Sequence, residues 1–97
     1  LNAIKLVIDY PKFFTPNDDG YNDTWNIKGI YSQPDATIFI FDRFGKLLKQ
    51  LKPDGNGWDG TFNGRKLPSG DYWFTLEYVE PLDDINRIFK SHFTLKR

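Results

Sequence analysis

The sequence contains no cysteine, a single histidine and no excess of charge of either sign. Without cysteine, a disulfide framework, a thiolate zinc site and a cysteine nucleophile are all excluded. Thirteen basic residues balance thirteen acidic ones, so no net field favours nucleic acid or an anionic membrane as a partner. The longest apolar run, from Ile38 to Phe41, is far too short to cross a bilayer. We therefore expect neither a nucleic-acid partner nor a direct membrane span.

The chain also lacks a charged-then-apolar signal peptide, and it begins abruptly at Leu1. We expect it to be the end of a much larger secreted or surface protein, whose inner-membrane signal lies far upstream. A chain of 97 residues supports one hydrophobic core that buries roughly 60–70% of the unfolded surface. Residues 1–97 are therefore predicted to form a single domain.

Aromatic residues are abundant, at 18% of the chain, and this favours strands over helices. Alternation with a period of two recurs, whereas helical periodicity is hard to find. The expected strands lie near residues 4–8, 24–28, 37–42, 46–51, 72–78 and 89–95. Because Thr37 to Asp42 is apolar on both faces, we expect it to be a central strand with Lys46 to Leu51 beside it.

Turn signals separate these strands. Gly45 can take a positive φ between two of them, and Asn63-Gly64 is typical of a type I′ hairpin turn. Pro68-Ser69-Gly70 and the segment 81–84 predict two further reversals. Six or seven short strands with such turns predict an all-β fold, namely an immunoglobulin-like antiparallel β-sandwich of about seven strands.

Several local strings are more specific than a strand pattern requires. They are Phe14–Trp25 (FTPNDDGYNDTW), Ile40–Lys46 (IFDRFGK), Gly57–Gly64 (GWDGTFNG) followed by Leu67–Phe74 (LPSGDYWF), and Lys90–Arg97 (KSHFTLKR). In this order and spacing they resemble the gliding motility-associated C-terminal domain, which is the type B sorting domain of the type IX secretion system. The resemblance covers roughly residues 10–97. One departure is Asp18, where the family more often has glycine, and this puts the tightness of that loop in question.

The resemblance implies a non-enzymatic signal that ends a large adhesin or secreted enzyme and is covalently fused to it as a passenger. It implies recognition by translocon or shuttle proteins of the type IX system, export through the periplasm and outer membrane, and delivery to the cell surface or medium. No cofactor is required for this role. Because the chain has too much hydrophobic pattern to remain an extended peptide in water, we expect recognition to read a folded surface.

The candidate recognition residues are Trp58, Asp59, Gly60, Lys96 and Arg97. A scaffold role is the alternative for the first three: Trp58 would anchor a loop in the core, Asp59 would accept backbone amides in an Asx turn, and glycine would supply positive φ. For Lys96 and Arg97 two interpretations stay open. They are either a charged edge that discourages strand pairing or a terminus presented to the translocon.

The loop from Asn17 to Asp23 resembles a short calcium loop. Asn17, Asp19 and Asp23 could each offer a side-chain oxygen, and Tyr21 a carbonyl. The bidentate glutamate that usually ends such loops is absent, and the set falls short of the usual 6–8 oxygen ligands. The alternative is a turn in which Asx side chains accept backbone amides.

Other residues fit less specific roles. His92 is predicted on the outward face of the last strand, and Asp83-Asp84 in a solvated turn. A carbohydrate-binding or adhesive immunoglobulin-like module is the main alternative function, and it would use an aromatic platform. That platform would be made of Tyr31, Trp58, Tyr72, Trp73 and Tyr78. Most of these positions also suit the core, and an exposed Trp73 would favour a binding role.

Overall fold

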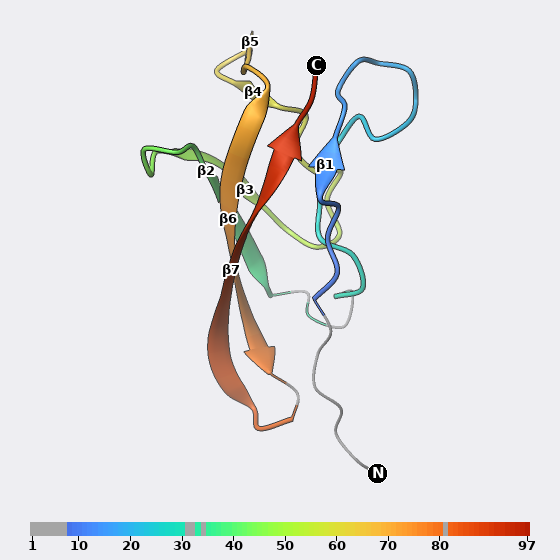
Figure 1. Cartoon of the computed structure of the whole chain (residues 1–97). Helices are drawn as coiled ribbons and strands as arrows, with labels where there is room; N and C mark the ends of the chain where they lie inside the picture. The colour runs from blue at the N-terminus through green and yellow to red at the C-terminus, as the bar shows by residue number, and fades with distance from the viewer. Residues whose placement is uncertain (1–7, 31–32, 34, 81) are drawn as a thin grey trace.

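The computed structural model describes residues 8–30, 33, 35–80 and 82–97, and the regular elements within them are all strands (Figure 1). In chain order they are β1 (Phe13–Phe14), β2 (Thr37–Phe41), β3 (Leu47–Leu51), β4 (Thr61–Phe62), β5 (Arg65–Lys66), β6 (Gly70–Glu80) and β7 (Ile85–Leu95). The predicted all-β chain of about seven strands is confirmed.

Five strands form one mixed sheet in the order β1-β7-β6-β2-β3, and β4 and β5 form a separate hairpin. The β6–β7 hairpin is the longest element, with its register unbroken from Gly70 opposite Leu95 to Glu80 opposite Ile85. The predicted central strand is confirmed, because β2 pairs with β6 on one side and with β3 on the other.

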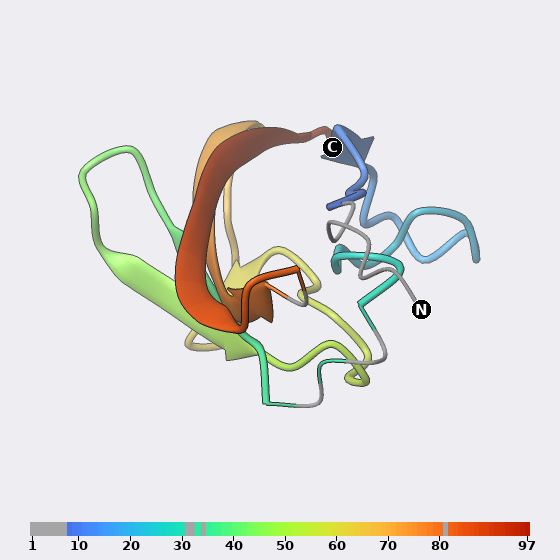
Figure 2. The same ribbon diagram turned by 90° about the horizontal axis from the view of Figure 1, so that it is seen from below.

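The core lies on one side of this sheet, which Figure 2 shows curving around the side occupied by residues 8–30. Alternation along β6 and β7 turns Tyr72, Phe74 and Phe93 inward, where all three are buried. Trp25 comes from the opposite layer and stacks on Phe93, with ring centroids 4.1 Å apart and planes 12° apart. The core is thus an aromatic cluster between one sheet and a layer of irregular segments.

That second layer differs from the predicted sandwich. Residues 24–28 were predicted as a strand, which is wrong: Trp25 forms an isolated bridge with Trp58, and Lys28 forms one with Asp9. Because the two bridges lead to different partners, no continuous ladder forms. Among the described residues, the only other sheet is the β4–β5 hairpin.

The prediction of a wholly antiparallel fold is also wrong, because β1 pairs with β7 in parallel. β1 and β7 are far apart in the sequence and are not joined by a hairpin, so no tight turn forces them to run in opposite directions. The predicted first strand at residues 4–8 lies outside the described residues except for Ile8, which is not in a strand.

The turns predicted at Gly45, at Asn63-Gly64 and between β6 and β7 are confirmed. Asn63 and Gly64 join β4 to β5 with φ values of 52° and 79°, as a type I′ turn requires. Gly45 reverses the chain between β2 and β3 with φ 83°. The Asp42 carboxylate accepts two backbone N–H groups of that turn, each at 2.9 Å. These positions depend on local chemistry, which the sequence carries directly.

Candidate recognition surface

Trp58 lies in the core, as its scaffold role predicts. Its side chain is only 1% exposed and its ring packs edge-on against Tyr72, with centroids 5.4 Å apart. The indole Nε1–H donates to the Thr61 carbonyl at 2.9 Å, and the backbone N–H and C=O groups of Trp58 and Trp25 bond to each other, both at 2.9 Å. Trp58 therefore ties the loop before β4 to the opposite segment of the core layer.

Asp59 forms the predicted Asx turn. Its Oδ1 accepts the Thr61 hydroxyl at 2.7 Å and the Thr61 backbone N–H at 3.1 Å. The hydrogen bond from the Thr61 hydroxyl is the main reason that the pKa of Asp59 lies below its ordinary value. Burial opposes this shift, and hydrogen bonds from backbone amides add to it. The residue is nevertheless exposed, so its carboxylate is both a turn former and a surface charge.

Gly60 is required by space as well as by conformation. Its φ is 82°, and a Cβ at this position would lie 2.9 Å from Leu95 Cδ1 and 3.1 Å from Arg97 Nη2. Its carbonyl accepts the Leu67 backbone N–H at 2.9 Å and the Arg97 Nη2–H at 2.9 Å. Glycine thus lets the loop approach the end of β7 closely enough to bond with it.

Arg97 is held by backbone carbonyls. Its guanidinium donates from Nε to Leu67 at 2.5 Å, from Nη2 to Gly60 at 2.9 Å and from Nη1 to Pro16 at 3.5 Å. Its own backbone N–H donates to the Ser69 hydroxyl at 2.8 Å. Arg97 therefore joins three segments that are far apart in the sequence.

Lys96 lies beside Arg97 but makes different contacts. Its backbone N–H donates to the Phe14 carbonyl at 2.9 Å, and its ammonium lies 4.6 Å from the centre of the Phe13 ring. Both the Lys96 and Phe13 side chains are exposed. Lys96 is thus a solvent-facing cation at the edge formed by β1 and β7.

The structure brings all five predicted recognition residues to one end of the sheet, where β1, the β4–β5 hairpin and the end of β7 lie side by side (Figure 1). We call this the Arg97 corner and define it by Pro16, Asp59, Gly60, Lys96 and Arg97. Trp58 and Gly60 are buried and shape the corner from within. Asp59, Lys96 and Arg97 supply the charge on its surface.

Sequence reasoning missed the residues that receive Arg97, namely Pro16, Leu67 and Ser69. Two of them act through main-chain carbonyls, which every residue carries. The strings that contain these residues were visible as parts of a resemblance, but nothing in them marked an arginine site. Only the fold shows that Pro16, Leu67 and Ser69 meet around Arg97.

The predicted calcium loop is closed by hydrogen bonds within itself. The Asp23 carboxylate accepts the backbone N–H groups of Asn17 at 3.1 Å, Asp18 at 3.0 Å and Gly20 at 2.8 Å. The side-chain oxygens of Asn17 and Asp19 accept the N–H groups two residues further on, at 3.2 and 2.8 Å. These are the Asx turns of the alternative interpretation.

The backbone conformation of Asp18 is one that glycine, the more frequent residue of the family at this position, also adopts. Its φ is 62°, a left-handed conformation that glycine adopts freely and that aspartate tolerates better than most residues. Within the described residues, no three His, Cys, Asp or Glu side chains are grouped so as to hold a metal ion. Calcium binding by Asn17, Asp19 and Asp23 stays a prediction.

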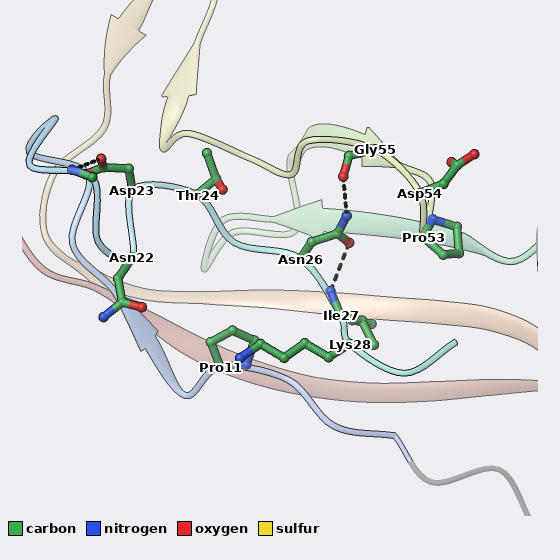
Figure 3. A pocket seen from close by; sticks show the side chains of 11 residues that line it. Pro11, Asn22, Asp23, Thr24, Asn26, Ile27, Lys28, Pro53, Asp54 and Gly55 are labelled. Atoms are coloured by element: carbon green, nitrogen blue, oxygen red, sulfur yellow. Dashed lines mark hydrogen bonds between the residues drawn. The ribbon is translucent and has the colours of Figure 1, made fainter. Parts of the chain in front are cut away.

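A polar groove of about 550 Å³ lies beside this loop (Figure 3). The Asn26 amide spans it, donating to the Lys52 and Gly55 carbonyls at 3.2 Å each, while its oxygen accepts the Ile27 N–H at 2.8 Å. No aromatic side chain lines the groove, so it offers no stacking surface for a sugar ring.

The predicted aromatic platform is mostly core. Trp58 and Tyr72 are buried, Tyr78 is partly buried, and Tyr31 lies outside the described residues. Of the four members that the structure describes, Trp73 alone is exposed, at 40%, on the outer face of β6.

Two minor predictions also concern exposed residues. His92 is exposed on the same outer face, with its ring centroid 6.3 Å from that of Trp73. Asp83 and Asp84 lie in the exposed turn after β6, where Asp83 accepts the Ile85 N–H at 3.1 Å and pairs with Arg87. Both positions agree with the surface roles predicted for them.

The described residues thus form a small all-β unit, and at the Arg97 corner segments far apart in the sequence meet. No helix among the described residues is long and apolar enough to span a membrane. The family of CHU_C type IX secretion signal domains matches residues 8–94, and the chain belongs to this family. No curated protein and no solved structure matches the chain.

Membership in this family establishes the role of the chain. It is a non-enzymatic sorting domain that directs export of the protein that carries it by the type IX secretion system. That protein is accordingly secreted or held at the cell surface. The resemblance given by the four sequence strings, and the export function it implied, are confirmed.

Proposed function

We propose that the export signal is the folded Arg97 corner, read by translocon or shuttle proteins of the type IX system at the outer membrane. The observation that carries this proposal is the side chain of Arg97, which donates to carbonyls of three separate segments. The last residues of the chain are thereby built into a surface that exists only in the folded domain.

The chemistry of the corner suits recognition by another protein. Asp59 and Lys96 are exposed charges of opposite sign, and Phe13 adds an exposed aromatic ring under the Lys96 ammonium. Aromatic residues are enriched at protein–protein interfaces, and polar groups lie at the rim around them. Trp58 and Gly60 are buried on either side of Asp59 in the sequence and hold its backbone in place. This supports the proposal, because it fixes the position of the Asp59 charge.

We also propose that the fold is an open immunoglobulin-like sandwich. In variable-type immunoglobulin domains, strands C, C′, F and G share one sheet. The chain order and pairing of β2, β3, β6 and β7 support this correspondence, since β7-β6-β2-β3 would read G-F-C-C′. The layer opposite would then be a second sheet reduced to isolated bridges.

Calcium binding at Asn17, Asp19 and Asp23 is a separate proposal. It rests on the concentration of side-chain oxygens in one short loop, and the ion would have to replace backbone N–H groups that those oxygens now accept. Calorimetric titration of the domain with millimolar calcium tests it. Absence of a binding heat, or of a shift in the melting temperature, would reject the site.

Fusion of residues 1–97 to a fluorescent passenger, in a bacterium that has this secretion system, tests the proposed recognition surface. We expect the passenger at the cell surface or in the medium. Charge reversal by Lys96→Glu should leave most of the passenger in the periplasm, because the variant reverses an exposed charge of the corner and removes the ammonium from the Phe13 ring. Deletion of residues 95–97 should have the same effect, whereas a generic adhesive module would tolerate it.

The matched control is Lys28→Glu, which reverses an exposed lysine outside the corner. We expect this variant to be exported like the unmodified fusion. Each fusion is also purified and its unfolding measured, so that a failure to fold is not mistaken for a failure of recognition. Equal export of the Lys96→Glu and unmodified fusions would contradict the proposal.

A further inference from the structure

Among the described residues, no strand pairs with the outer edge of β7 between Ile85 and Phe93. The Thr94 N–H donates to the Lys12 carbonyl at 2.9 Å, so at Thr94 the backbone faces away from β6 and toward β1. The pairing of β7 with β6 has no shift in register, so alternate residues face the same way. The backbone groups of Asn86, Ile88, Lys90 and His92 therefore point outward, and within the described chain β1 pairs only with Thr94 and Leu95.

The other exposed edges of the sheet are blunted. Where β6 extends beyond β2, the Gln33 amide covers its edge by donating to the Val79 carbonyl at 2.7 Å and accepting the Val79 N–H at 3.1 Å. The β2–β3 ladder is interrupted by a register shift between Ile40 and Phe41, and bulges of this kind discourage further strand pairing. From Ile85 to His92, β7 has neither a covering side-chain amide nor a register shift among the residues that the structure describes.

The charge of this edge indicates what it would pair with. The chain as a whole is neutral, yet residues 85–92 contain Arg87 and Lys90 and no Asp or Glu. Arg87 pairs with Asp83, which leaves Lys90 as the cation of the open edge. Lys90 and His92 lie at the open positions, and Ile88, at 59% exposure, supplies an apolar contact between them and the turn. A second copy paired in antiparallel would bring like charges face to face, which is unfavourable.

We propose that the edge of β7 from Ile85 to His92 binds an extended acidic segment of a partner protein as an added strand. Main-chain hydrogen bonds to Asn86, Ile88, Lys90 and His92 would supply affinity, as in other cases of strand addition. Acidic side chains opposite Lys90 and an apolar one opposite Ile88 would supply specificity. The inference rests on the proposed function in one respect, namely that a folded surface is read during export.

A peptide of alternating glutamate and valine is the direct probe. Added to the isotopically labelled domain, it should shift the amide resonances of Asn86, Ile88, Lys90 and His92 and slow their hydrogen exchange, and salt should weaken the binding. A peptide of alternating lysine and valine is the matched control and should not bind. Equal binding of the two peptides, or protection elsewhere in the domain, would overturn the proposal.

Ile88→Pro separates backbone pairing from side-chain contact. Proline at this position removes an N–H that points away from β6, so the β6–β7 ladder keeps its hydrogen bonds. We expect affinity for the acidic peptide to fall roughly tenfold or more, the effect of losing one well-formed hydrogen bond and straining its neighbours. Ile88→Ala keeps the N–H and should bind within about threefold of the unmodified domain.

Lys90→Glu provides a second, independent variant should the proline unfold the hairpin. This variant should lower the affinity of the domain for the acidic peptide and allow it to bind the basic peptide. A dimer seen by sedimentation and abolished by Ile88→Pro would instead assign the edge to a second copy, which overturns the proposal.

In the passenger assay, a folded Ile88→Pro fusion that is exported normally would reject a role for the edge in export and leave the Arg97 corner untouched. Failure of Lys96→Glu to impair export, with Ile88→Pro impaired, would reject the corner and retain the edge. The two proposals therefore fail separately.

Discussion

The two ends of the β6–β7 hairpin differ in how closely their residues are packed. At the Arg97 corner, one side chain donates to three carbonyls, and a glycine is packed too closely to accept a methyl group. At the other end, which we call the hairpin end (residues 80 and 82–88), Leu82, Ile85 and Ile88 are each more than half exposed. Figure 1 shows the corner beside β1 and the β4–β5 hairpin, while the hairpin end extends away from them. The same two strands are thus tightly packed against other segments at one end and expose apolar side chains to solvent at the other.

Removing a large side chain at each end tests this difference in packing most strongly. Trp58→Ala should destabilise the domain by about 3–5 kcal/mol, because it leaves a cavity in an aromatic core. Ile88→Ala should change the free energy of unfolding by less than about 0.5 kcal/mol, since the side chain is largely exposed. Urea unfolding followed by tryptophan fluorescence or circular dichroism measures both. Similar losses in the two variants would show that the hairpin end is as tightly packed as the corner.

Two glycines with nearly the same φ test the packing of the corner itself. Gly60→Ala should cost about 2–4 kcal/mol, from left-handed backbone strain together with the overlap with Leu95 and Arg97. Gly64→Ala should cost about 1–2 kcal/mol, from strain alone, because nothing lies within 4 Å of its added Cβ. The difference between the two unfolding free energies reports the contact. No difference would mean that the corner relaxes freely.

Two arginines test whether the hydrogen bonds of the corner matter. Arg97→Ala should destabilise the domain by about 1–2 kcal/mol, since it leaves the Gly60 and Leu67 carbonyls without the guanidinium. Arg87→Ala removes only an exposed ion pair with Asp83 at the hairpin end, and we expect no measurable change in the melting temperature. Thermal unfolding of the two variants at one salt concentration makes the comparison. A larger effect of Arg87→Ala would reverse our account of the two ends.

The smallest expected effect concerns pH. Because the folded pKa of Asp59 is depressed, chiefly by the Thr61 hydroxyl, its contribution to stability is present above the unfolded pKa of about 3.9 and is lost as pH falls through the folded pKa. Asp59→Asn should therefore have a shallower loss of stability below about pH 4 than the unmodified domain. Unfolding curves between neutral and acidic pH measure the slopes. Parallel slopes would show that Asp59 does not contribute.

Local features of this fold were predictable because local chemistry determines them. The Asn63-Gly64 turn, Gly45 and the alternation of buried residues along β6 and β7 follow from backbone sterics and from the period of a strand. The Asx turn at Asp59 belongs to the same class. Each depends on residues that are neighbours in the sequence.

Features that depend on distant partners were not predictable in the same way. Residues 24–28 alternate like a strand, yet their two bridges go to Trp58 and Asp9, so the ladder never forms. The parallel pairing of β1 involves only Phe13 and Phe14, too few residues to leave a pattern. The acceptors of Arg97 are carbonyl groups, which no residue type reveals.

The most direct test of the central claim compares the whole domain with its last segment alone. The same fluorescent passenger is fused to residues 1–97 or to residues 85–97, and the fraction exported is measured for both. If the signal is a folded corner, only the whole domain will export the passenger, because residues 85–97 lack the Pro16, Gly60 and Leu67 carbonyls that position Arg97. Equal export by the short segment would contradict a folded signal and establish a linear one.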